Sequence, residues 1–209
     1  MSGIQNININ KFELKLADTD DPIAQKVSWE PAKHGGANFK TQKVEFAANK
    51  IIIKKTIGMI LFGLAFALPG LVVLLGVAPY NFINGEAGTG FFLLLWGTIF
   101  SGVGVGMMMF GKPFVFDRSR GVFYRGKKYG SNPTGKKKTQ GMFSEIHAIQ
   151  LISERIHSSK NNYTSYELNL VFKDGNRLNV MDHGGEQAIE DAAKQLGQML
   201  NVPIWQASY

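Results

Sequence analysis

Two long apolar runs interrupt an otherwise polar chain. The first extends over residues 57–78 and the second over residues 91–110, and neither contains Asp, Glu, Lys, Arg or His. A helix of about 20 apolar residues crosses a hydrocarbon core of about 30 Å. Helices buried in soluble proteins rarely run that far without a charge. The pattern therefore predicts two transmembrane helices over these residues, joined by an external loop over residues 79–90.

Charged residues around the runs predict their orientation. The connecting loop carries one charge, Glu86, whereas basic residues lie on both outer flanks: Lys50, Lys54, Lys55, Lys112, Arg118, Arg120 and Arg125. Cytoplasmic segments of membrane proteins are enriched in Lys and Arg. We therefore expect both termini in the cytoplasm and the loop outside. About 50 mostly polar residues precede the first run, and this position excludes a cleaved signal peptide.

Small residues at four-residue spacing recur along both runs: Gly63 with Ala67, Gly97 with Ser101, and Gly102 with Gly106. Such pairs let helix backbones approach closely in lipid. Either the two helices pack on each other as a hairpin, or a face remains for another membrane protein or a second copy. Because the runs lack ionisable residues, they offer no path for protons or ions. A pump or channel acting alone is not expected.

The polar parts of the chain alternate as β-strands do. Tyr166, Leu168, Leu170 and Phe172 share one face, and the chain turns at Asp174 and Gly175. This pattern predicts a hairpin. Matching its apolar faces requires a loop of about three residues with a glycine or asparagine in the left-handed region.

Further strands and one helix complete a cytoplasmic α+β domain. Hairpins are predicted at residues 42–56 and around residues 118–121. A longer strand begins at Ile146, with either Ala148, Gln150 and Ile152 or Ile149 and Leu151 facing the core. Helical spacing predicts a terminal helix, with apolar positions at Ile189, Ala192, Ala193, Leu196, Met199 and Leu200.

Residues 41–56 and 112–205 together are expected to form this domain. A transmembrane hairpin returns the chain to its starting side, so the strands before and after it can share one antiparallel sheet system closed by the helix. The hairpin is then inserted between strands of the domain. Residues 1–40 form a separate N-terminal segment, a docking tail or an extra strand. A buried Trp29 would make that segment part of the domain.

Three blocks carry a resemblance: "FVFDRSRGVFYRG", "FSEIHAIQLISE" and "YELNLVFKDGNRLNVMDHG", followed by the terminal helix. Over residues 40–205 they resemble bacterial pleckstrin-homology-like (PH-like) domains that accompany paired membrane spans in two-pass proteins. The resemblance implies a binding or scaffolding module in the bacterial inner (cytoplasmic) membrane, with no catalytic residues. The insertion of the spans within the domain departs from that pattern.

Several kinds of chemistry are excluded or disfavoured. The chain has no cysteine, so thiol catalysis, disulfides and thiolate metal sites are excluded. Its histidines, His34, His147, His157 and His183, lack metal-binding spacing. No metal or cofactor is predicted.

One string nearly matches a nucleotide-binding motif. Residues 106–113, "GMMMFGKP", approach the pattern G-x-x-x-x-G-K-[ST], but Pro113 replaces the hydroxyl residue. The string also lies mostly within the second apolar run. We interpret it as the cytoplasmic end of a membrane helix.

The string "MDHGGEQ" has two interpretations. Asp182 beside His183 could orient an imidazole for acid–base catalysis. Alternatively, the strand ends at Met181, either Asp182 or His183 caps the following helix, and Gly184 and Gly185 make the turn. We favour the cap, because no nucleophile with its own motif accompanies the pair.

Basic residues are concentrated after the second run. The chain has a net charge of +7, and residues 112–138 contain nine of its basic residues against one acid, Asp117: Lys112, Arg118, Arg120, Arg125, Lys127, Lys128, Lys136, Lys137 and Lys138. Near a cytoplasmic membrane face, such residues are expected to contact anionic lipid or a partner. Nucleic acid is not an expected partner.

These patterns predict a non-catalytic, membrane-anchored scaffold or accessory subunit. Its β domain and its small-residue helix faces would bind a protein partner or a second copy. Two alternatives remain: a membrane-bound hydrolase or transferase that uses Asp182 and His183, and a module that binds anionic lipid headgroups.

Overall fold

The computed structural model describes residues 7–9, 12–16, 20–32, 36, 40–109, 111–130, 139–156 and 162–206. The chain forms two compact units. The β domain consists of Met1–Lys54 and Pro113–Tyr209, and the apolar hairpin consists of Lys55–Lys112.

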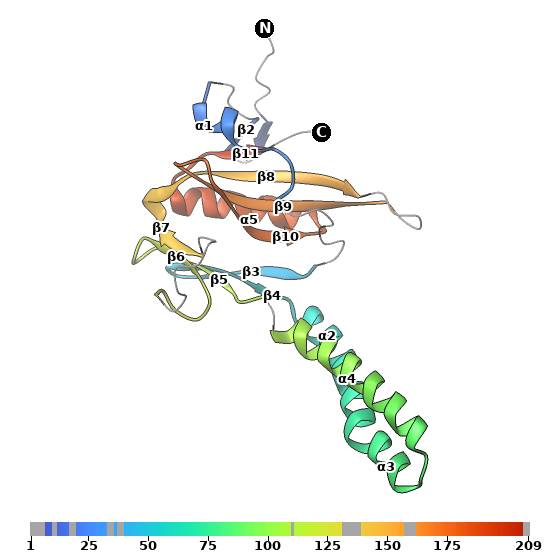
Figure 1. Cartoon of the computed structure of the whole chain (residues 1–209). Helices are drawn as coiled ribbons and strands as arrows, with labels where there is room; N and C mark the ends of the chain where they lie inside the picture. The colour runs from blue at the N-terminus through green and yellow to red at the C-terminus, as the bar shows by residue number, and fades with distance from the viewer. Residues whose placement is uncertain are drawn as a thin grey trace. The chain divides into compact units, whose positions relative to one another are not determined.

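The first sheet of the β domain contains strands that precede the apolar hairpin in the sequence and strands that follow it (Figure 1). In spatial order it contains β3 (Gln42–Ala47), β4 (Lys50–Lys55), β5 (Phe114–Asp117), β6 (Val122–Arg125) and β7 (Gln140–Met142). β4 and β5 pair in antiparallel fashion, with Lys50 opposite Asp117 and Ile53 opposite Phe114. The apolar hairpin is therefore an insertion between two strands that pair directly.

A second sheet corrects the prediction of one sheet system. Its spatial order is β1 (Ile7–Ile9), β2 (Phe12–Leu16), β11 (Ile204–Gln206), β8 (Ile146–Ile156), β9 (Tyr163–Phe172) and β10 (Arg177–His183). A 3-10 turn over Phe143–Glu145 carries the chain from β7 directly into β8. The division has a physical reason, because two sheets bury their apolar faces in one common core.

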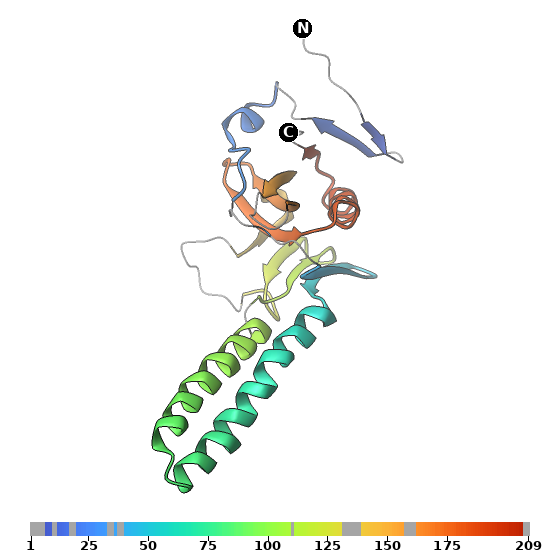
Figure 2. The same cartoon turned by 90° about the vertical axis from the view of Figure 1, so that its right-hand side faces the viewer.

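This core joins both sheets to the terminal helix, α5 (Glu186–Leu200). α5 contacts β8, β9, β10 and β11, and Figure 2 shows it nearly end-on beside those strands. The core includes side chains from both sheets and the helix that are at most 4% exposed: Ile51, Ile53, Phe114, Phe116, Phe123, Ile149, Leu168, Leu170, Phe172, Ile189 and Leu196. Burial of this apolar surface is the main favourable term in folding the β domain.

The hairpin of β9 and β10 has the predicted three-residue loop. Arg177 pairs with Val171 and Leu178 with Leu170, so residues 173–175 form the loop. Gly175 has a φ of +80°, in the left-handed region. The prediction of a glycine in this conformation is confirmed.

A bulge near the start of β8 explains why this strand read in two phases. Ile146 pairs with Phe172 and Ala148 with Val171, which leaves His147 as the extra residue. After the bulge, Ile149 and Leu151 face the common core, whereas Ala148 packs on the opposite side of the sheet. Both phases are therefore used, one on each face. We call the side of Ala148 the outer face of the second sheet.

The apolar hairpin contains two helical runs. The first comprises α2 (Ile57–Val72), a π-helical turn (Val73–Val77) and α3 (Ala78–Ile83), and the second is α4 (Ala87–Met109). Both runs are long and apolar enough to cross a membrane, judged by length and composition. The first run has 27 residues, about 40 Å at the rise of an α-helix.

Most of the segment expected as an external loop is helical. Only residues 84–86 connect α3 to α4, although Pro79 lies in the first turn of α3. A proline ring clashes with the carbonyl four residues earlier in a regular α-helix. The wider π-helical turn directly before Pro79 relieves this clash, and the helix continues.

Candidate functional site

The helices α2 and α4 pack through small residues. The contact is formed by Gly63, Ala67 and Gly70 of α2 and by Gly97, Ser101 and Gly104 of α4, all of them buried. A Cβ atom at Gly104 would overlap the backbone nitrogen of Ala67 and lie 2.5 Å from the carbonyl oxygen of Gly63. The hydroxyl of Ser101 donates to its own helix, to the carbonyl of Gly97 at 2.6 Å. The two backbones therefore approach as closely as glycine permits.

Four of the six predicted packing residues lie in this contact, and two do not. Gly63, Ala67, Gly97 and Ser101 are buried in it. Gly102 is exposed, and a Cβ there would meet nothing within 4 Å, while Gly106 is half-buried. Gly70 and Gly104 take part instead. Extending each four-residue pair by three residues, to the spacing 63–67–70 and 97–101–104, would have found them.

Lys55, which precedes α2 in the chain, caps the C-terminal end of α4. Its ammonium donates to the carbonyl of Met107 at 2.6 Å and to that of Met108 at 3.0 Å. The last carbonyls of a helix lack partners within the helix and carry negative partial charge. Burial lowers the pKa of this ammonium. Lys55 thus supplies hydrogen bonds to carbonyls in the last turn of α4. Gly111, at a φ of +92°, changes the direction of the chain after α4.

Asp182 and His183 each make a hydrogen bond with a different residue. Asp182 accepts a hydrogen bond from the side chain of Asn179 at 2.7 Å. The Nδ1 atom of His183 accepts one from the backbone of Gly185 at 2.9 Å, and the ring is buried. Successive side chains of a strand point to opposite faces. Burial lowers the pKa of His183 and favours the neutral ring that this bond requires. The bond lies in the turn into α5, but the prediction that Asp182 or His183 caps this helix is wrong, because β10 extends to His183 and the N-cap is Gly185, without a side-chain hydrogen bond.

The structure describes six of the nine predicted basic residues. Five of them are exposed: Lys112, Arg118, Arg120, Lys127 and Lys128. The guanidinium of Arg120 lies 5.5 Å from the ring centre of Tyr129, which brings the turns at 118–121 and 126–130 together. Lys136, Lys137 and Lys138 lie outside the described residues.

Arg125 has a structural position that its sequence neighbours do not indicate. Its Nη2 atom donates to the carbonyl of Asn179 at 2.9 Å, and its guanidinium lies 5.5 Å from the ring centre of Phe114. Because Arg125 belongs to β6 and Asn179 to β10, this side chain links the two sheets. The lipid or partner contact predicted for Arg125 remains a prediction.

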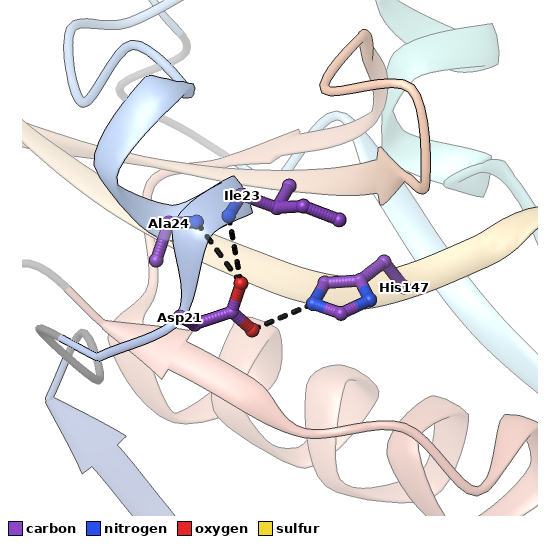
Figure 3. Close-up of polar contacts among 4 residues, drawn as sticks. All are labelled: Asp21, Ile23, Ala24 and His147. Carbon is purple, nitrogen blue, oxygen red and sulfur yellow. Dashed lines mark hydrogen bonds and ion pairs between the residues drawn. The ribbon is translucent and has the colours of Figure 1, made fainter.

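After β2, which pairs with β11, the N-terminal segment contacts the β domain again at Asp21 (Figure 3). One carboxylate oxygen caps the short helix α1 (Pro22–Lys26), accepting from the amides of Ile23 at 2.8 Å and Ala24 at 3.4 Å. The other lies 2.6 Å from Nε2 of His147, the bulged residue of β8. An ionised carboxylate only accepts hydrogen bonds, so Nε2 carries the proton. The bulge thus directs His147 to the N-terminal segment.

Two tryptophans hold the segment by apolar contact. The ring centres of Trp29 and Trp205 are 6.1 Å apart, and Trp205 is only 1% exposed. Ala24 and Val27 are buried in the same cluster, against Ala148 and other residues of the outer face. Trp29 is half-buried rather than buried, and these contacts make residues 20–32 part of the β domain.

Beyond the helix, the segment crosses the outer face, where side chains of the sheet bind its backbone. Gln150 donates to the carbonyl of Ser28 at 3.0 Å, Arg177 donates to the carbonyl of Glu30 at 2.9 Å, and the amide of Ala32 donates to Glu167 at 3.0 Å. These contacts fall on every second residue of the segment. Arg177 also donates to Gln150 at 3.1 Å, which joins two of the three binding groups.

The polar groups under the segment are deeply buried. Gln150 and Asn169 are 0% exposed and Glu167 is 6% exposed. Asn169 donates to Glu167 at 2.5 Å, but its own carbonyl oxygen, Oδ1, is buried without a hydrogen-bond partner in the described part of the protein. Buried polar groups are normally paired. The outer face thus offers one acceptor that the segment leaves unused.

Acid is expected to loosen the segment through Asp21. Burial raises the pKa of this carboxyl, but hydrogen bonds from His147 and from the amides of Ile23 and Ala24 outweigh it, so the pKa lies below the ordinary 3.8. A group with a lowered pKa stabilises the folded state above its ordinary value. That contribution is lost as the pH falls through the lowered pKa.

The protection factors of residues 22–32, measured against the intrinsic exchange rate at each pH, should therefore fall below about pH 4. In Asp21→Asn, which keeps a capping oxygen but loses the titration, the dependence should be weaker; Asp21→Ala should cost about 1 kcal/mol at neutral pH. Equal acid dependence in the wild type and in Asp21→Asn would contradict this role of Asp21.

Comparison with known proteins does not identify a relative of this chain. No protein-family model matches the chain, and no curated protein matches its sequence. The resemblance to PH-like domains remains a prediction. Among the described residues, no three His, Asp or Glu side chains gather in a way that could hold a metal ion.

Proposed function

We propose that the protein is a non-catalytic scaffold or accessory subunit anchored in the bacterial inner membrane, with its β domain in the cytoplasm. The observation that most supports this is the insertion of an apolar helical hairpin between the paired strands β4 and β5. Such an insertion ties the domain to its anchor by two covalent connections. The fold alone permits many roles, so the proposal rests on the surfaces that follow.

The outward faces of the hairpin favour contact with lipid. Large apolar side chains are exposed along both helices, among them Leu75 at 73%, Ile83 at 84% and Phe91 at 66%. Helices of a soluble core would bury such side chains, and exposed apolar patches of this extent mark membrane or protein contacts. The small residues are used within the hairpin, which makes it a compact anchor. Gly102 lies on the outward side, where another membrane protein can approach.

The β domain favours a polypeptide partner. Its outer face binds a chain segment through backbone contacts at Ser28, Glu30 and Ala32. The exposed basic turns with Arg118, Arg120, Lys127 and Lys128 add a surface for anionic lipid, at about 1 kcal/mol for each residue near the membrane. The separate hydrogen bonds of Asp182 and His183 favour the scaffold over the hydrolase or transferase alternative.

Cysteine labelling tests the location, because the natural chain contains no cysteine. Asn84→Cys in the connecting turn should react with a membrane-impermeant maleimide on intact spheroplasts. Ser119→Cys in the turn of the β domain should react only after lysis. Labelling of Ser119→Cys in intact spheroplasts would reverse the proposed orientation.

The mass of the purified assembly tests the scaffold role. Extraction of native membranes in mild detergent should give a complex clearly heavier than the 23.1 kDa chain after correction for detergent. A monomer as the sole species, with correct topology, would contradict a scaffold or accessory subunit while leaving the membrane anchor intact.

A further inference from the structure

The groups on the outer face bind backbone atoms of the N-terminal segment. Gln150, Arg177 and Glu167 contact two carbonyls and one amide, which any extended chain presents. From these contacts, and building on the proposed scaffold role, we infer that the outer face is a binding site for an extended segment of a partner protein. Residues 21–32 occupy it as an intramolecular inhibitor.

The spacing of the bound residues supports recognition of a non-helical backbone. The bound groups belong to residues 28, 30 and 32, alternate residues of a stretch that forms neither helix nor strand and bends at Glu30 and Ala32. Side chains of β8, β9 and β10 supply the partners, one from each strand. The segment therefore lies across the strands and is bound by side chains on the outer face of the second sheet.

The buried carbonyl oxygen of Asn169 indicates that residues 21–32 are not the best possible occupant. Asn169 and Gln150 are opposite each other in the register of β8 and β9. An unpaired buried acceptor costs free energy that a donor would recover. A partner segment that supplies an N–H group to this oxygen gains a contact that the intramolecular segment lacks.

The anchors of the segment define the chemistry of the partner. Trp29 packs on Trp205, and eight residues before it Asp21 caps a short helix and binds His147. The site therefore fits a polypeptide with an acidic residue, one helical turn and an extended stretch that carries an aromatic side chain. Few interactions of the site depend on the other side chains of the occupant.

Peptide binding to the full-length chain tests this inference. The probe is a fluorescent peptide with the sequence of residues 20–32, and the receptors are the wild type and Asp21→Ala/Trp29→Ala, which weakens the intramolecular occupant. The double variant should bind the probe about tenfold or more tightly than the wild type, because a tethered segment competes at millimolar effective concentration. Gln150→Leu in that background should abolish the gain, whereas Lys173→Ala, an exposed change in the β9–β10 loop, should preserve it.

Hydrogen exchange of the wild type provides a second measurement that does not depend on the folding of a variant. Excess unlabelled peptide should accelerate exchange of residues 22–32 while β9 stays protected. Two results would overturn the inference: no binding to a folded double variant, or binding that Gln150→Leu leaves unchanged. A wild-type dimer formed by exchange of residues 21–32 between copies would overturn it as well. The two peptide-binding results would leave the topology and mass expected from the proposed function unchanged, and an exchanged dimer would overturn the inference while raising the assembly mass, so the two proposals can fail separately.

Discussion

Replacing Gly104 with leucine is expected to separate the two helices of the apolar hairpin. A side chain at this position meets backbone atoms of Ala67 and Gly63, which cannot rotate away. The helices must move apart, and contacts along their whole interface weaken. Overpacking typically costs about 1–3 kcal/mol, and a clash with backbone places this change at the upper end. Unfolding of the full chain in mixed detergent micelles measures the loss.

Gly102 provides a matched control on the same helix. A Cβ there meets nothing within 4 Å, so Gly102→Leu should leave the hairpin at least as stable as the wild type. It also replaces glycine by a better helix former. Equal destabilisation by the two substitutions would show that the small residues do not hold the helices together. Loss of complex mass in Gly102→Leu alone would instead indicate a partner on the outward side.

Local patterns in the sequence predicted the elements that depend on neighbouring residues. Alternation located the hairpins around residues 118–121 and 173–175, and helical spacing located α5. The two apolar runs likewise appear as long apolar helices. Each of these features depends on side-chain periodicity or on turn chemistry within a few residues.

Features that depend on distant residues could not be predicted in this way. β11 is three residues long and pairs in parallel with β2 and β8, so nothing near Ile204 indicates it. The division into two sheets depends on where the chain turns between β7 and β8. The contact between Arg125 and Asn179 joins residues far apart in the sequence, so no local pattern indicates it. Single substitutions of such residues affect parts of the chain that are far away in sequence.

The N-terminal segment illustrates how these distant contacts connect fold and function. His147 is the bulged residue of β8, and the bulge keeps Ile146 and Ile149 in the core while His147 reaches Asp21. The same irregularity that preserves the core therefore supplies the contact that holds the segment. The segment is held by the hydrogen bond between Asp21 and His147, by apolar contacts of Ala24, Val27 and Trp29, and by backbone contacts, and such a local unit can open without unfolding the domain.

Trp205→Ala is expected to be the most damaging single substitution outside the common core. Trp205 is 1% exposed, lies in β11, and contacts both Trp29 and His147. Removing a buried Trp side chain costs about 3–5 kcal/mol. The loss should lower the unfolding free energy of the β domain and accelerate hydrogen exchange of residues 21–32 at neutral pH.

Substitutions of the two other tryptophans distinguish release of residues 21–32 from a general loss of stability. Trp29→Ala should free residues 21–32 with a smaller loss of domain stability, because Trp29 is half-buried and belongs to no strand. Trp96→Ala, whose ring stacks on Phe100 in α4 with ring centres 4.0 Å apart, should leave exchange of the segment unchanged. If Trp205→Ala left residues 21–32 protected, the aromatic contact would not hold the segment. The backbone contacts to Gln150, Arg177 and Glu167 would then be sufficient, and an extended partner would need no aromatic side chain to bind.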